Sequence, residues 1–170
     1  MKIFHEEFST GQILKAADVS NAALQTWIRR GLIVGQKDTG IDMPGQPGKR
    51  RAFTYFNAVE IATAAALVAG GCDLRDAFQA GAHFAHAGTD GRIPGLPFKD
   101  GLTVLCVAGD RSADLRWAKG VDIYVSARHA LGHPLSITML DMNELIDRVC
   151  VALGHHPQKV IDQAYNQAAE

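Results

Sequence analysis

The sequence has few cysteines and no long apolar run, and each shortage excludes a class of protein. Cys72, Cys106 and Cys150 are far apart and form no CxxC pair, so we expect buried reduced thiols rather than a disulfide framework or a structural zinc site. No apolar stretch approaches the roughly 18–20 residues of a membrane span. Residues 1–8 lack the apolar segment of a signal peptide. We therefore expect a cytoplasmic protein with no membrane partner.

Motifs of catalysis are also missing. The chain contains no P-loop and no GxGxxG fingerprint. Cys106 lies within an apolar run, where a reactive thiolate is disfavoured. His83 and His86 lack cysteine or carboxylate partners at the spacing of metal ligands. We accordingly expect no enzyme, no cofactor and no metal site.

Charge is distributed unevenly along the 170 residues, although the net charge is only −1. Residues 1–56 carry eight basic and five acidic side chains, whereas the remainder carries nine basic and thirteen acidic ones. A basic first third on an acidic body indicates a protein that approaches a polyanion with one face.

The amino-terminal pattern predicts two helices joined by a short turn. Ser9 and Gln12 have the spacing of a capping box, which opens a helix that continues to Ala17. Ser20 or Asn21 caps a second helix, and Gly31 ends it. The residues expected on its inner face are Leu24, Trp27 and Ile28.

A wing and two further helices are expected next. We define the wing segment as residues 32–54, with short strands at 32–34 and 51–54 around a loop rich in glycine and proline at 35–50. A helix capped by Asn57 is expected to about Ala69, and another from Asp73 to about His86. Residues 88–101 are again rich in glycine and proline.

The last third changes character and predicts strands. Residues 102–108 read as a buried strand, and residues 121–126 and 136–140 as two more, with a helical turn or an excursion at 112–119. Helices are expected to begin after Asp141 and at Pro157. The predicted fold class is α+β: a winged helix-turn-helix with two following helices, then a small sheet of about three strands packed by helices. The predicted domains are 1–88 for DNA binding, a linker at 89–101, and 102–170 for dimerisation or regulation.

The outer face of the second helix offers side chains that can read bases. Glutamine pairs bidentately with adenine, arginine with guanine or phosphate, and threonine or alanine contacts the thymine methyl group. Basic residues of the wing segment could hold phosphates. The candidate DNA-binding residues are Ser20, Asn21, Ala22, Gln25, Thr26, Arg29 and Arg30 on the helix, and Lys37, Lys49, Arg50 and Arg51 on the wing segment.

Three stretches carry a resemblance to a known family. Residues 8–20 (FSTGQILKAADVS), 24–33 (LQTWIRRGLI) and 53–61 (FTYFNAVEI) resemble the amino-terminal part of MerR-type transcriptional regulators. The resemblance covers about residues 8–80 and implies a winged helix that binds DNA as a homodimer. Alanine, alanine, glutamine and threonine at 22, 23, 25 and 26 stand where that family often has Arg, Thr, Arg and Tyr. Residues 88–101 replace the family's long dimerising helix, so its effector mechanism is not carried over.

Taken together, these features favour a bacterial or phage-type transcriptional regulator that binds double-stranded DNA as a homodimer. The apolar strand at 102–108 and the last helix are candidates for the dimer surface, and residues 102–170 could receive a small-molecule or protein effector. Two alternatives remain open: a winged helix that serves as a protein-interaction module, and a phage architectural or recombination protein that bends DNA.

Overall fold

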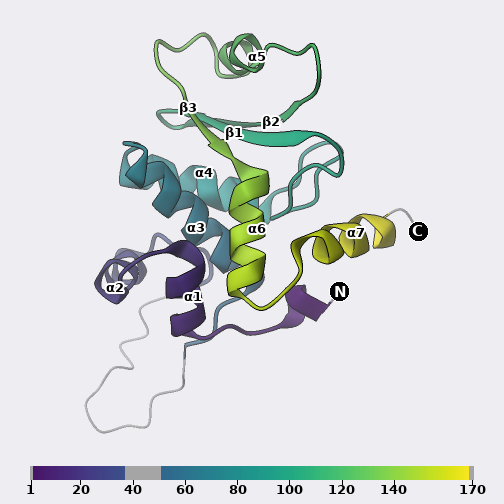
Figure 1. Ribbon diagram of the computed structural model, residues 1–170. Coiled ribbons are helices and arrows are strands. Elements are labelled where there is room, and N and C mark those ends of the chain that lie inside the picture. Colours follow the sequence, from purple (N-terminus) through teal and green to yellow (C-terminus); the bar gives the residue numbers. More distant parts are fainter. Residues whose placement is uncertain (1, 37–50, 169–170) are drawn as a thin grey trace, which may run out of the picture.

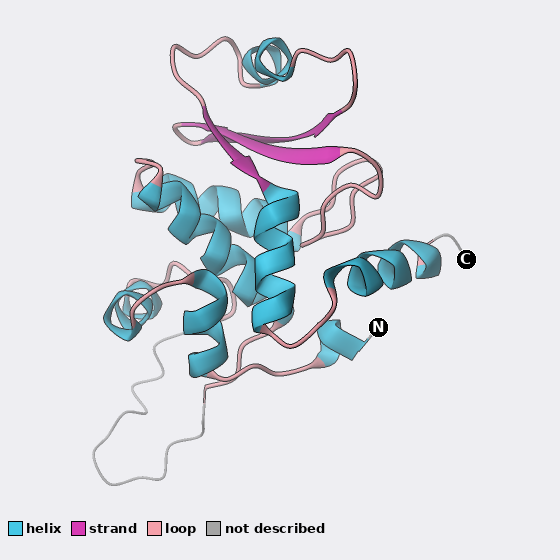
Figure 2. Cartoon of the chain, viewed as in Figure 1, coloured by secondary structure: helices cyan, strands magenta, loops and turns pink. Residues whose placement is uncertain are grey.

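The computed structural model describes residues 2–36 and 51–168, and over these it has the α+β class that the sequence predicts. The described part contains seven α-helices, a 3-10 helix and a three-stranded sheet (Figures 1 and 2). The elements are η1 (Lys2–His5), α1 (Thr10–Ala17), α2 (Asn21–Arg29), α3 (Tyr55–Ala69), α4 (Leu74–His86), β1 (Leu102–Ala108), β2 (Arg111–Trp117), α5 (Ile123–Ala130), β3 (Thr138–Asp141), α6 (Met142–Ala152) and α7 (Pro157–Gln167). None of the described helices is long and apolar enough to cross a membrane.

The predicted helix-turn-helix is confirmed, including its caps. Ser9 and Gln12 form the capping box of α1, and the hydroxyl of Ser20 accepts a hydrogen bond from the Ala23 N–H at the start of α2. Between the helices, Asp18 takes a left-handed conformation with φ of 51°. Gly31 ends α2 with φ of 65°, a conformation that glycine adopts without the steric cost of a Cβ.

Helix α3 forms the centre of the fold and begins two residues before the predicted Asn57 cap. Thr54 is the N-cap, and Asn57 is its partner in a capping box. The helix is buried along most of its length and packs against α1, α4 and α6. A Cβ placed at Gly81 of α4 would lie 2.7 Å from the Glu60 carbonyl oxygen, so only a glycine at this position permits the close approach of the two helices.

The sheet is antiparallel in the order β2-β1-β3, and two of the sequence interpretations around it are wrong. Residues 112–119, predicted as a helical turn or an excursion, belong largely to β2, because Gly109 and Asp110 make a two-residue turn that returns the chain beside β1. Residues 121–126, predicted as a strand, instead open α5. There the Asp122 carboxylate accepts from the N–H groups of Tyr124 and Val125, and this cap outweighs the strand preference of the apolar residues. The strand at 102–108 is confirmed, and the third strand lies at 138–141.

Each face of the sheet is covered. Leu105 and Val107 of β1 face the main core, whereas Val104 and Cys106 face α5 in a smaller cluster. In Figure 1, α5 lies on one side of the sheet, and α3, α4 and α6 lie on the other. The main core is one cluster that runs from Ile3 to Ala164 and includes residues of both predicted domains. The division of the chain into two folding units at 89–101 therefore stays a prediction.

The wing segment differs from the predicted pair of strands. Residues 32–34 form no strand and lead into a turn in which the Gln36 N–H donates to the Ile33 carbonyl oxygen. Phe53 pairs instead with Phe8 through backbone hydrogen bonds of 2.8 and 3.0 Å. The partner of residues 51–54 is therefore the segment that precedes α1, because Phe8 and Phe53 bury their side chains in the core. The predicted positions Lys37, Lys49 and Arg50 lie outside the described residues.

Candidate nucleic-acid interface

Helix α2 presents a polar face to solvent and an apolar face to the core. Leu24, Trp27 and Ile28 are buried, and the Trp27 ring packs edge-on against Phe78 at 5.1 Å between centroids. This confirms Trp27 as a core residue. On the other face, the predicted DNA-binding side chains are exposed or half-buried, so the described chain leaves this outer face open to solvent. These side chains are Asn21, Ala22, Gln25, Thr26, Arg29 and Arg30.

Short-range hydrogen bonds order this outer face. The Thr26 hydroxyl donates to the Ala22 carbonyl oxygen at 2.8 Å, and Arg29 donates to the Thr26 hydroxyl at 3.4 Å. These two bonds leave most of the Arg29 guanidinium donors open to solvent. Contacts of 3.4 Å between exposed groups are long, so exchanging them for bonds to a base or phosphate costs little.

Two further predicted positions differ in what they can contribute. The Gln25 amide donates to Asn21 Oδ1 at 3.4 Å, which leaves the Gln25 carbonyl oxygen free of hydrogen bonds within the described chain. The Ser20 hydroxyl, in contrast, already accepts from the Ala23 N–H as the helix cap. Ser20 therefore acts first as a structural residue, and Gln25 is the side chain better placed to read a base.

The base of the wing segment is held by α3, through residues that the sequence interpretation did not select. Buried Glu60 accepts from the Val34 N–H at 3.0 Å, and the Asn57 amide donates to the Val34 carbonyl oxygen at 2.9 Å. Gln36 donates to the Ala52 carbonyl oxygen at 3.0 Å, so the two ends of the segment are tied together. The sequence signal for these contacts was the presence of two polar residues, Asn57 and Glu60, three positions apart in an apolar stretch.

Glu60 also joins α3 to α4. Its second oxygen lies 3.0 Å from Nε2 of His86, while the Glu60 side chain is completely buried. One carboxylate thereby holds both the wing segment and the carboxyl end of α4. Of the predicted wing residues, Arg51 is described and half-buried.

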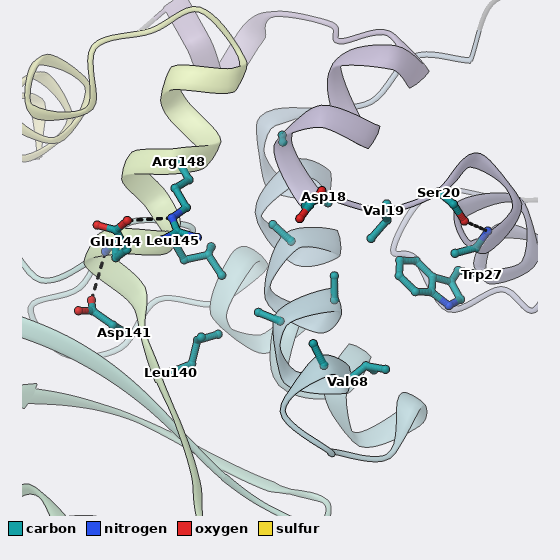
Figure 3. A pocket seen from close by; sticks show the side chains of 17 residues that line it. Asp18, Val19, Ser20, Trp27, Val68, Leu140, Asp141, Glu144, Leu145 and Arg148 are labelled. Atoms are coloured by element: carbon teal, nitrogen blue, oxygen red, sulfur yellow. Dashed lines mark hydrogen bonds and ion pairs between the residues drawn. The ribbon is translucent and has the colours of Figure 1, made fainter.

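A groove of about 570 Å³ lies directly beside the helix-turn-helix (Figure 3). Its floor is alanine-rich and comes mainly from α3. One wall carries Val19 and Trp27, and the opposite wall carries Leu145 with the Glu144–Arg148 ion pair of α6. In Figure 3, Asp18 stands on the first wall and Asp141 on the second. The groove thus connects the turn before α2 with the carboxy-terminal section.

The cysteines and histidines form no reactive cluster among the described residues. Burial raises the pKa of the Cys106 thiol to about 11, and that of Cys150 to about 11 as well, so both stay protonated near neutral pH. His155 binds Glu6 at 2.9 Å, and His86 binds Glu60. Residues 2–36 and 51–168 contain no group of three potential metal ligands.

Comparisons with known proteins add no family to this geometry. No family model matches the chain, and no curated protein matches it significantly.

Proposed function

We propose that this chain is a cytoplasmic, sequence-specific DNA-binding regulator of transcription of the MerR-like winged-helix type. Helix α2 lies in the major groove, the wing segment contacts the backbone, and two copies bind two half-sites. The observation that carries the proposal is the outward face of α2, where Arg29 and Arg30 are exposed beside half-buried Gln25 and Thr26. Gln25 and Thr26 lie in the middle of the helix and the two arginines at its carboxyl end, and side chains of these types on an outer helix face can pair with base edges and with phosphates.

The clamp on the wing segment supports the same function. A wing that contacts phosphates needs a fixed base, and Glu60 with Asn57 supplies one from the central helix. Phosphate contacts give affinity and register, while base contacts from α2 give sequence preference. A single small module makes few base contacts, so the homodimer adds the free energies of two half-sites.

Selection of bound fragments from the source genome tests this proposal. The full chain should enrich a small set of fragments that share an inverted repeat. An Arg29→Ala/Arg30→Ala variant should lose the enrichment while keeping its circular dichroism spectrum. Equal enrichment of all fragments would favour the architectural alternative, and no enrichment would favour the protein-interaction module. The predicted effector at 102–170 stays a prediction, and the groove beside α2 is a described cavity that reaches those residues.

A further inference from the structure

Strand β2 is an edge strand whose outer side is paired with no described strand. It is seven residues long and pairs only with β1, in the register Ala108↔Arg111 to Leu102↔Trp117. In a two-residue hairpin, the residues that flank the turn exchange backbone hydrogen bonds, and the pattern then alternates. By this alternation, the N–H and C=O groups of Ser112, Asp114 and Arg116 point outward from the sheet. A long free edge of this kind is a template for another strand.

Exposed apolar side chains gather beside this edge. Trp117, Val121, Tyr124 and Val125 are 42%, 41%, 50% and 60% exposed, and all four lie within nine consecutive residues at the end of β2 and the start of α5. Helix α5 packs against β2 more than against the other strands. The open edge and the apolar residues therefore belong to one end of the molecule, on the opposite side of the core from α2 in Figure 1.

The sequence of β2 is complementary to itself in the antiparallel direction. A two-fold axis at Asp114 places Ser112 opposite Arg116 of a second copy, and Arg111 opposite Trp117. In this register, the outward backbone N–H and C=O groups of residues 112, 114 and 116 pair with the same groups of the second copy, and none of them is left unpaired. On the α5 face, Arg111 would meet an exposed indole ring, a favourable cation–π pair.

The opposite face of β2 offers complementary charge. The Asp114 side chain is buried and paired with Arg92, but its Oδ1 atom has no hydrogen-bond partner within the described chain. Arg116 is exposed and has no ion pair there. In the two-fold register, Arg116 of the second copy stands diagonal to Asp114, within reach of a long side chain. One arginine from each copy thus flanks the two central Asp114 residues on this face and offsets the repulsion between their carboxylates.

We propose that two copies of this chain pair through β2 to form a continuous six-stranded antiparallel sheet, with the two α5 helices adjacent across the two-fold axis. This assigns a surface to the homodimer of the proposed function, and it replaces the two surfaces expected from the sequence. Strand β1, predicted as a candidate dimer surface, is the central strand and is buried on both faces. Helix α7 has an apolar face, but Val160, Ile161 and Ala164 already bury it in the core.

Sedimentation equilibrium without DNA tests the interface independently of DNA binding. The wild-type chain, of 18.3 kDa, should sediment as a dimer at micromolar concentration. Val125→Glu should weaken the dimer at least tenfold, because it places two charges at the seam. Val151→Glu is the matched control, since Val151 is 64% exposed on α6, away from β2, and it should leave the dimer unchanged. A monomeric wild-type chain, or equal dissociation constants for both variants, would overturn the proposal.

Disulfide trapping tests the register. Residues 112 and 116 are too far apart within one strand to be bridged, but in the proposed dimer they are directly opposed at about 5.5 Å between Cα atoms, within disulfide range. A Ser112→Cys/Arg116→Cys variant should therefore form a covalent dimer on mild oxidation, whereas Arg111→Cys/Arg116→Cys should not. The reverse result would overturn this pairing. A wild-type chain that is dimeric but binds no duplex DNA would overturn the proposed function and leave the interface standing, so the two proposals fail separately.

Discussion

Arg92 and Asp114 form an ion pair of 2.7 Å in which both side chains are completely buried. The same guanidinium donates to the carbonyl oxygens of Phe84 and Ala87 at the end of α4, and to those of Ile93 and Leu96. One side chain thus fixes the segment after α4 to strand β2. Sequence alone placed Arg92 only in a glycine- and proline-rich break.

Removing Arg92 should destabilise the fold strongly. Arg92→Met leaves the Asp114 carboxylate buried without its partner, which costs about 3–5 kcal/mol in the free energy of unfolding. Urea denaturation measures the change. The double variant Arg92→Met/Asp114→Leu should recover part of the loss, because no buried charge remains. A loss below about 1 kcal/mol in the single variant would show that the pair does not hold the segment.

Gly81 should tolerate no side chain. The Cβ of Gly81→Ala would lie 2.7 Å from the Glu60 carbonyl oxygen, so α3 and α4 must separate. We expect a loss of about 1–3 kcal/mol, typical of overpacking. Gly11→Ala is the control, because its Cβ meets no atom within 4 Å and the change favours helix α1. Equal effects of the two variants on thermal unfolding would contradict the close approach.

Arg29→Ala should weaken DNA binding and leave the fold intact. The Arg29 side chain is exposed, and among the described residues its only hydrogen bond is a long one to Thr26 within the same helix. Removal of one bond to a base or phosphate costs about 1–3 kcal/mol in binding, or roughly fivefold to 150-fold in affinity. Lys159→Ala on α7 removes the same charge far from α2 and should change affinity little. Fluorescence anisotropy on a selected fragment measures both.

Charge reversal in the wing segment should act on all sequences alike. Arg50→Glu/Arg51→Glu should lower affinity for specific and unrelated DNA by the same factor, because backbone contacts carry no sequence information. The slope of log K against log salt should become shallower by about one for each phosphate that the variant no longer neutralises. A circular dichroism melt checks folding, and an unchanged slope would mean that the wing segment does not touch the backbone.

Thiol reactivity should follow burial and pH. With the pKa of Cys106 and Cys150 raised to about 11, their thiolate fractions are small at pH 8 and grow as the pH rises toward that value. Half-buried Cys72 should therefore be alkylated first in the folded protein. The folded state holds the two protons more tightly than the unfolded chain does, so the free energy of unfolding should fall between the ordinary thiol pKa and about 11. Rapid labelling of Cys106 at pH 8, followed by mass spectrometry, would contradict this burial.

Local signals predicted most of the helices, but at α5 the apolar pattern concealed a cap that is also local. The caps at Ser9, Ser20 and Asp141, and Pro157 at the first turn of α7, act within three residues, so spacing alone located them. The segment 121–126 carries apolar side chains that suit a strand, and only the Asp122 cap distinguished it as a helix.

The candidate site, too, could be predicted from the sequence only in part. The outward face of α2 follows from helical periodicity, so its exposed residues were predictable from sequence. The clamp between Glu60 and Val34 joins residues 26 positions apart, and the bond between Arg92 and Asp114 joins residues 22 apart. Both depend on how α3, α4 and the sheet pack, which no local pattern contains.

Methylation interference tests the central claim, that α2 enters the major groove, most directly. Guanine N7 lies in the major groove and adenine N3 in the minor groove, so methylation at each position reports one groove. On a selected fragment, guanine N7 methylation within each half-site should block the wild-type protein. The Arg29→Ala variant should lose this sensitivity at one position per half-site. Binding that is unaffected by any guanine N7 methyl group, or the absence of a complex with duplex DNA, would contradict the account.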